Sequence, residues 1–109
     1  MRLTYVIKFV AEMDRAVAFH RDALGLALRF ASPEWSEFET GATTLALHAA
    51  DERHPAGSCQ LGFGSEDLDA LYAGREARGI AFTLPPTDQH GQRIARFVDP
   101  DGAETSVGG

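Results

Sequence analysis

The 109-residue chain contains one pattern twice, and this internal repeat constrains the fold more than any other feature. Each half reads as a strand, a helix followed by glycine, and three further short strands. Glu12-Met13-Asp14 at the start of the first helix corresponds to Asp67-Leu68-Asp69, and Ala23-Leu24-Gly25-Leu26 corresponds to Ala77-Arg78-Gly79-Ile80. Because one such module alone would leave an apolar sheet face exposed, the repeat predicts that two modules fold together.

Hydrophobic periodicity places the elements, with modules at residues 1–49 and 59–109 of a single domain spanning 1–109 and a polar linker at 50–58. Helices are expected at Met13–Leu24 and Asp67–Arg78, each followed by a glycine that suits a left-handed cap. Pro85–Gly91 is expected to form a polar loop. The expected strands are Leu3–Val10, Leu26–Phe30, Trp35–Thr40, Thr43–His48, Gln60–Gly64, Ile80–Leu84, Gln92–Val98 and Ala103–Val107.

Composition excludes several classes of protein. Ten Lys and Arg against sixteen Asp and Glu give a net charge of −6, which disfavours nucleic acid as a partner. The single cysteine, Cys59, allows neither an internal disulfide nor a zinc site made of thiolates alone. The sequence has neither an apolar run long enough to cross a membrane nor the pattern of a signal peptide, so we expect a cytoplasmic protein without a membrane partner.

Three segments together resemble the vicinal oxygen chelate superfamily. They are YVIKFVAEMDRAVAFHRDALGL near the start, QLGFGSEDLDALYAGREARGI in the middle, and FVDPDGAE near the end. This superfamily includes glyoxalase I, extradiol dioxygenases, fosfomycin-resistance enzymes and bleomycin-resistance proteins. The resemblance implies an α+β fold in which two β-α-β-β-β modules form a curled eight-stranded mixed sheet around a cavity, commonly in a homodimer.

The metal site of the superfamily is where this sequence departs from the resemblance. Members of the glyoxalase type carry His, Glu or Gln at four ligand positions, which correspond here to Tyr5, Ala46, Gln60 and Ser106. Alanine offers no donor atom, and neutral phenol and hydroxyl oxygens bind divalent metals poorly compared with imidazole or carboxylate. The sequence therefore predicts no bound metal and no other cofactor.

Strand alternation extends the candidate site beyond these four positions. Ala46 and His48 share a strand face, because side chains two residues apart point the same way. If Asp99–Gly102 is a four-residue turn, Phe97 and Glu104 share a face with Ser106, and Arg96 lies on the reverse. The cavity is then expected to be lined by Tyr5, His48, Gln60, Phe97, Glu104 and Ser106. Structural alternatives remain open: a half-solvated His48, and an ion pair between Glu104 and Arg93.

Other reactive side chains have simpler interpretations. His20 is expected to pack, and His54 in the linker and His90 in a loop are expected to be structural or solvated and not catalytic, because the histidines show no metal-binding spacing. Lys8, the only lysine, is expected to extend toward a sheet end. Cys59 is expected to be a small buried hydrophobe facing a helix. Trp35 and Phe38 lie on opposite faces of one strand, so only one of them faces the cavity.

These observations favour a metal-free protein that holds a small organic ligand between its modules, in the manner of bleomycin-resistance proteins. The alternative is a lyase, isomerase or dioxygenase of the same superfamily, with a divergent metal site or an acid–base pair such as His48 and Glu104. A third possibility is an interaction module whose cavity has closed. The expected partners are a small organic ligand and a second copy of the chain in a homodimer.

Overall fold

The repeat seen in the sequence is a repeat of structure. In the computed structural model, which describes residues 1–109, the fold is α+β and divides into two compact units. We call Thr4–Cys59 the N-terminal unit, and Gln60–Gly109 together with Met1–Leu3 the C-terminal unit. Each unit carries one β-α-β-β-β module, and the strands of each module form a mixed sheet. The α+β class predicted from the sequence is confirmed.

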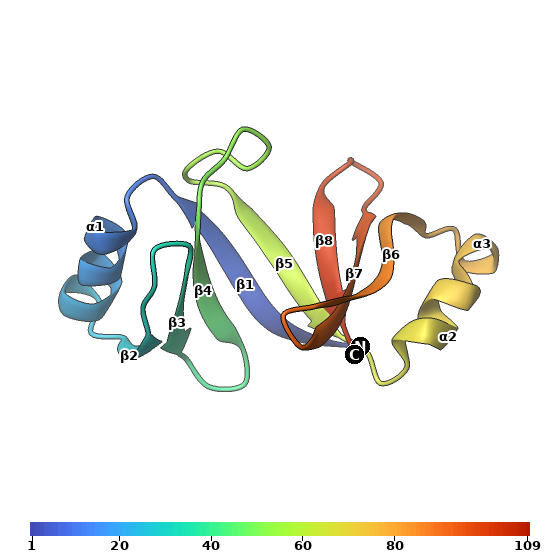
Figure 1. Ribbon diagram of the computed structural model, residues 1–109, viewed down its shortest axis with the longest axis horizontal. Coiled ribbons are helices and arrows are strands. Elements are labelled where there is room, and N and C mark those ends of the chain that lie inside the picture. The colour runs from blue at the N-terminus through green and yellow to red at the C-terminus, as the bar shows by residue number, and fades with distance from the viewer. The chain divides into compact units, whose positions relative to one another are not determined.

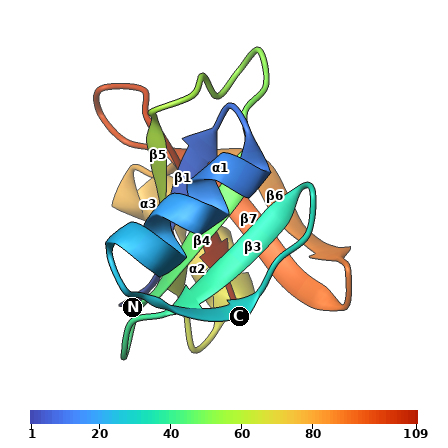
Figure 2. The same cartoon turned by 90° about the vertical axis from the view of Figure 1, so that its left-hand side faces the viewer.

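The sheet of the N-terminal unit has the strand order β2-β3-β4-β1. Strands β3 and β4 pair antiparallel, as do β2 and β3, whereas β1 pairs parallel with β4. Helix α1 packs on one face of this sheet, as the blue helix in front of the strands in Figure 2 shows. The elements, labelled in Figure 1, are β1 (Arg2–Val10), α1 (Met13–Ala18), the π-helix η1 (Phe19–Ala23), β2 (Ala27–Phe30), β3 (Trp35–Glu39) and β4 (Thr44–Ala49).

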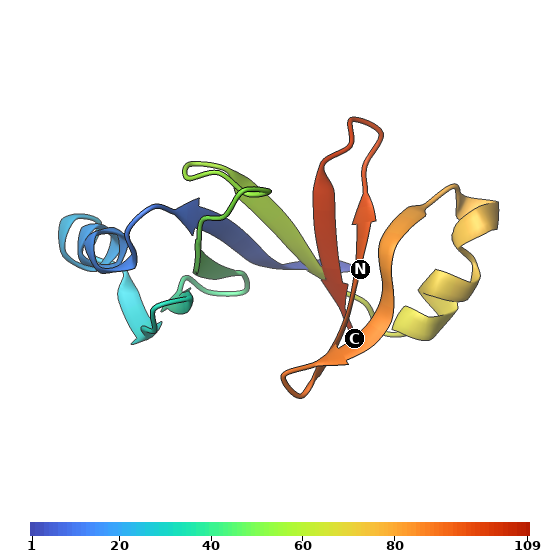
Figure 3. The ribbon, with the colours of Figure 1, turned by 45° about the horizontal axis from the view of Figure 1, so that its top comes forward.

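The C-terminal unit repeats this arrangement with the order β5-β8-β7-β6. Strand β8 pairs parallel with β5 and antiparallel with β7, which in turn pairs antiparallel with β6. Helices α2 and α3 lie beside β6, as Figure 3 shows. The elements are β5 (Cys59–Gly64), α2 (Leu68–Ala73), α3 (Arg75–Arg78), β6 (Ala81–Gln89), β7 (Gln92–Val98) and β8 (Glu104–Gly108).

Both predicted helices occur, but neither is a continuous α-helix. The first changes at Phe19 into a π-helix, in which the Phe19 carbonyl accepts from the Leu24 amide. The second is interrupted at Gly74, between α2 and α3. The expected glycine caps are confirmed, because Gly25 and Gly79 have φ angles of 70° and 72°. No helix of the structure is both long and apolar enough to span a bilayer.

The prediction of a loop at Pro85–Gly91 was wrong. Strand β6 continues to Gln89, and the hairpin turns at His90 and Gly91, whose φ angles are 51° and 77°. Two positive φ angles in a two-residue turn are typical of the hairpin turns that match strand twist. The prolines are accommodated because β6 is the outermost strand of the unit and shifts register between Leu84 and Thr87.

Each sheet has a helix face, which packs against the helices, and a helix-free face. In the N-terminal unit, Phe38 and Leu47 are fully buried on the helix face beside Val17 of α1. A second apolar cluster forms on the helix-free face, and it contains Ile7, Phe9 and Ala46. In the C-terminal unit, the helix face buries Leu68, Leu71, Ala95 and Val107. The helix face therefore holds the core of the C-terminal unit and one of the two core clusters of the N-terminal unit, whereas the second cluster of the N-terminal unit lies on its helix-free face.

Gly79→Ala and Gly74→Ala should change stability in opposite directions. Gly79 has a left-handed backbone conformation, so an alanine there costs about 1–2 kcal/mol of unfolding free energy. This cost is conformational, because the added Cβ would meet no atom within 4 Å. Gly74 has a right-handed φ of −87°, and a Cβ there makes only ordinary contact with the Ala70 carbonyl. Alanine at that position should raise stability by up to about 1 kcal/mol. Urea denaturation of both variants tests this, and equal losses would contradict it.

Candidate functional site

Three aromatic side chains form a row on the helix-free face of the N-terminal unit. Tyr5 comes from β1, Trp35 from β3 and His48 from β4. The ring centroids of Tyr5 and Trp35 lie 6.1 Å apart, and those of Trp35 and His48 lie 5.9 Å apart with an interplanar angle of 89°. Edge-to-face and tilted arrangements at these distances are favourable for aromatic pairs. The structure therefore brings Tyr5 and His48, two predicted site residues, to the same aromatic row.

A carboxylate that the sequence analysis did not select lies next to this row. Glu37 stands directly opposite Ala46 in the β3–β4 pairing and is only 8% exposed. Its Oε2 accepts from the indole Nε1 of Trp35 at 2.8 Å, and its Oε1 accepts from an Arg29 guanidinium nitrogen at 2.8 Å. Charge-assisted hydrogen bonds of this kind are stronger than neutral ones. Glu37 thus fixes the orientation of the Trp35 ring while its own charge is compensated.

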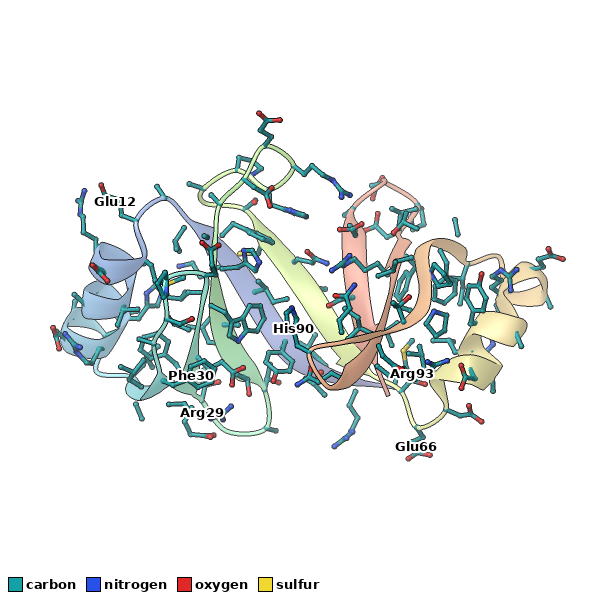
Figure 4. The ribbon with its side chains drawn as sticks, viewed as in Figure 1. Glu12, Arg29, Phe30, Glu66, His90 and Arg93 are labelled. Carbon is teal, nitrogen blue, oxygen red and sulfur yellow. The ribbon has the colours of Figure 1, made fainter.

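A β-bulge aims Arg29 at this carboxylate. Leu28 lies opposite Phe38 and Phe30 lies opposite Glu37, so Arg29 is an extra residue in β2. A bulge re-aims the side chains around it, and here the Arg29 guanidinium contacts both Glu37 and Glu39. Figure 4 labels Arg29 and Phe30 at this position. Alternation in Trp35–Glu39 already places Trp35 and Glu37 on one face, but no sequence signal marks the bulge.

The same alternation decides between the two candidate aromatic residues of β3. Phe38 is fully buried in the helix-face cluster with Val17 and Leu47. Trp35 lies on the opposite face, where it packs against the cluster of Ile7, Phe9 and Ala46. The two side chains lie on opposite faces, as predicted, and Trp35 is the one on the helix-free face.

Burial and a neighbouring negative charge alter the acidity of Tyr5. Burial raises the pKa of the Tyr5 phenol above its ordinary value of 10.0, and the charge of Glu37 raises it further. Arg29 acts in the opposite direction, but less strongly than these two causes. Tyr5 therefore stays a neutral phenol throughout the physiological pH range.

His48 has one of its two ring nitrogens engaged by the backbone. Its Nδ1 lies 2.7 Å from the Ala49 carbonyl oxygen, which only accepts, so Nδ1 carries the proton. In the neutral ring, Nε2 then keeps its lone pair as an acceptor. Phe9 packs against the His48 ring at 5.3 Å, and its ring stacks on His54 at 4.4 Å. His54, expected to be structural or solvated, is a stacked, half-buried ring, which fits the structural alternative.

In the C-terminal unit, the predicted register of the last hairpin was wrong by one residue. Arg96 pairs with Ser106 and Phe97 pairs with Thr105, so the turn is one residue longer than expected. The Asp99 carboxylate stabilises it by accepting from the amides of Asp101 and Ala103. A shift of one residue exchanges the faces of a strand. Arg96, not Phe97, therefore shares the helix-free face with Ser106.

Phe97 accordingly belongs to the core and not to the candidate site. It packs with Phe82 and the helix-face cluster, at a centroid distance of 5.8 Å from Phe82. The strand pairing of the two modules agrees with this, because Phe97 pairs with Thr105 as Phe38 pairs with Leu45. Phe38 and Phe97 hold equivalent positions in the two modules, and both serve as core residues.

The other three predicted residues of this unit share the helix-free face. Gln60 is 7% exposed, and Ser106 lies across from Gly62, two residues after Gln60 on β5. The Ser106 hydroxyl donates to the Leu61 carbonyl at 3.5 Å, the outer limit for such a bond. Glu104 accepts from the Thr83 hydroxyl at 3.2 Å and makes no contact with Arg93, which pairs with Asp69 and Asp88. That these residues bind a ligand stays a prediction.

Two further side chains differ from expectation. The Lys8 ammonium does not extend to a sheet end but donates to His20 Nε2 at 3.2 Å. His20 is 4% exposed and its Nδ1 donates to the Ala16 carbonyl at 2.7 Å, so the predicted packing role is confirmed. Cys59, expected to be buried, is exposed at the first position of β5, ahead of the part of the strand that packs against a helix.

The donor atoms at the four superfamily ligand positions do not fit a divalent metal. Ala46 supplies no donor, Tyr5 is a neutral phenol, and Gln60 and Ser106 offer only an amide and a hydroxyl. Glu37 lies beside Ala46, but Arg29 and Trp35 already engage its two oxygens. Nowhere do three His, Cys, Asp or Glu side chains gather in a metal-binding group. Two surface hollows, beside α1 and α2, include none of the predicted site residues.

A family model for the glyoxalase/bleomycin resistance protein/dioxygenase superfamily matches residues 2–107. The chain belongs to this superfamily. A curated relative, the uncharacterised protein YraH of Bacillus subtilis (strain 168), is 26% identical over 118 residues, which cover 93% of this chain and 92% of YraH. The resemblance stated from the sequence is thereby confirmed.

Solved structures of the superfamily share the fold at low sequence identity. A glyoxalase/bleomycin resistance protein/dioxygenase superfamily member from Vibrio splendidus 12B01 has a TM-score of 0.68 at 18% identity, covering 98% of this chain and 96% of its own. A Streptomyces coelicolor methylmalonyl-CoA epimerase variant, in complex with 2-nitronate-propionyl-CoA, has a TM-score of 0.78 at 19% identity, covering 99% and 96%. At these identities the likeness shows the fold alone.

Removing the Glu37 carboxylate should destabilise the protein, whereas removing the Glu39 carboxylate should change little. Glu37→Ala deprives Trp35 and Arg29 of a buried acceptor, at a cost of about 2–3 kcal/mol in unfolding free energy. Glu39→Ala removes a second, exposed partner of the same guanidinium and serves as the matched control. Chemical denaturation followed by circular dichroism measures both. A loss at Glu37 no larger than that at Glu39 would show that the network is not structural.

Alkaline pH should weaken the fold through Tyr5. Because its pKa is higher in the folded chain than the ordinary 10.0, the stabilising contribution is present below pH 10 and is lost as pH rises through the folded value. Tyr5→Phe should therefore flatten the fall in melting temperature above pH 10. Tyr72→Phe, in the chain's other tyrosine, is the control. An unchanged profile in the Tyr5 variant would exclude this contribution.

Proposed function

We propose that this protein binds a small planar organic molecule on the helix-free face of the N-terminal unit, without a metal ion. The observation that carries the proposal is the aromatic row of Tyr5, Trp35 and His48. Ligand sites in proteins combine apolar and aromatic walls with a few fixed polar groups. Here Nε2 of His48 and the phenol of Tyr5 supply polar atoms at two ends of the row.

The rigidity of this row supports binding. The indole of Trp35 is held by Glu37, and Glu37 is in turn held by Arg29. A side chain that is fixed before the ligand arrives loses little conformational entropy on binding. The network therefore presents the aromatic surface in one orientation, which favours a flat ligand over a flexible one.

The proposal also accounts for the unusual residues at the metal positions. Stacking on aromatic rings and hydrogen bonding to neutral groups need no Lewis acid, so Ala46 and a neutral Tyr5 are compatible with binding. A metal-dependent reaction needs the ligands that these positions lack. Membership of the superfamily provides the fold, and the residues of this chain favour sequestration over metal-assisted catalysis.

The single tryptophan makes the proposal directly testable. A neutral planar quencher, 4-nitrobenzamide, should reduce Trp35 fluorescence in a saturable way in metal-free protein, and chelator should change neither binding nor melting temperature. Tyr5→Ala should weaken binding about tenfold, ~1.4 kcal/mol, because it removes one end of the row. The matched control is Phe19→Ala, which removes an exposed aromatic ring from η1.

Two outcomes would overturn the proposal. Equal losses in the Tyr5 and Phe19 variants would show that quenching is not specific to the aromatic row. Stoichiometric metal in the purified protein, lost together with stability when chelator is added, would instead favour an enzyme with a divergent metal site.

A further inference from the structure

The helix-free face of the C-terminal unit contains a half-buried arginine at an equivalent position to Glu37. Arg96 lies opposite Ser106 on β8, as Glu37 lies opposite Ala46 on β4. Thr83 is an extra residue of β6 beside Arg96, as Arg29 is beside Glu37. The two modules therefore share one backbone arrangement but place opposite charges at its centre.

The two arginines of β7 differ in what neutralises them. Arg93, three residues away and on the opposite face, contacts Asp69 of α2 at 2.7 Å and Asp88 of β6 at 3.4 Å. Arg96 makes no side-chain hydrogen bond or ion pair, although it is half-buried. A guanidinium stays charged at all physiological pH values and presents a planar fork of donors. Its partly desolvated charge is therefore available to an anion.

Neutral donors accompany this charge on the same face. Gln60 is more than nine-tenths buried, and no protein group hydrogen-bonds to its side-chain amide. No buried side-chain nitrogen or oxygen in the structure lacks a partner, so the Gln60 amide atoms keep access to solvent, and a ligand on this face can reach them. The Ser106 hydroxyl makes only one long hydrogen bond, to the Leu61 carbonyl. Because that bond is at the outer distance limit, replacing it with a shorter bond to a ligand oxygen costs little free energy.

The geometry points to a carboxylate as the ligand of these groups: we propose that Arg96, Gln60 and Ser106 form a binding site for a singly charged organic carboxylate. A guanidinium binds a carboxylate through two parallel hydrogen bonds, and the amide and hydroxyl supply further donors. Glu104 lies on the same face, where Thr83 engages it. Its negative charge disfavours a doubly charged phosphate more than a carboxylate.

This proposal is independent of the aromatic row, because its residues belong to the other unit and its probe is not aromatic. Acetate should shift the Arg96 side-chain Nε–H signal in a ¹H–¹⁵N spectrum in a saturable way at millimolar concentrations. Acetamide, its neutral isostere, should not, and inorganic phosphate should bind more weakly than acetate. The Arg96 signal reports acetate binding to the C-terminal unit whether or not 4-nitrobenzamide binds to Trp35.

Matched variants of the two arginines on β7 test which guanidinium binds acetate. Arg96→Gln should weaken acetate binding about tenfold or more, and Gln60→Leu should weaken it to a smaller extent. Arg93→Gln removes the same charge from the other face of β7 and should leave acetate binding unchanged. Arg96→Lys keeps the charge without the fork and should retain only part of the affinity. Because Arg96 makes no side-chain bond in the fold, its substitution should leave the melting temperature unchanged.

Three results would overturn the proposal. Equal weakening by Arg96→Gln and Arg93→Gln would show a general effect of protein charge. Equal responses to acetate and acetamide would show that charge is not recognised, and tighter binding of phosphate than of acetate would assign the site to another class of anion.

Discussion

The two-residue alternation of side chains across each sheet is the constraint on which the rest of this structure depends. One face of each sheet must be apolar because it packs against the helices, so every second residue of the central strands belongs to the core. Phe38 and Leu47 do this in one unit, Ala95 and Val107 in the other. The intervening residues lie on the helix-free faces, where Ile7, Phe9 and Ala46 form a further buried cluster and from which all the candidate functional side chains come.

The two modules allow the helix-face positions and the helix-free-face positions to be compared within a single chain. Positions that bury side chains keep similar chemistry, as Phe38 and Phe97 show, because both fill the space under a helix. Positions on the helix-free faces have diverged: Glu37 stands at the equivalent position to Arg96, and Ala46 stands at that of Ser106. Packing restricts the first set of residues strongly, whereas the second set changes without loss of the fold.

The same separation explains how the chain keeps the superfamily fold without the metal-ligand chemistry. Tyr5, Ala46, Gln60 and Ser106 all lie on helix-free faces, so substituting them leaves the helix-face cores intact. What replaces the ligands differs between the units. The N-terminal unit has aromatic rings oriented by a compensated carboxylate, and the C-terminal unit has a half-buried guanidinium on the same face as neutral donors.

The sequence alone determined the fold class, the two modules, nearly all element positions and the glycine caps, because periodicity and backbone preference are local properties. It also determined that the four ligand positions lack metal-binding chemistry, since donor type depends only on residue identity. It did not determine the register of the last hairpin, where one extra turn residue moved Phe97 into the core and brought Arg96 to the face of Ser106. Nor did it reveal the bulge that turns Arg29 toward Glu37. Register and bulges were decided by the tertiary structure, because they depend on how strands far apart in the sequence pair and on which alignment buries the apolar face.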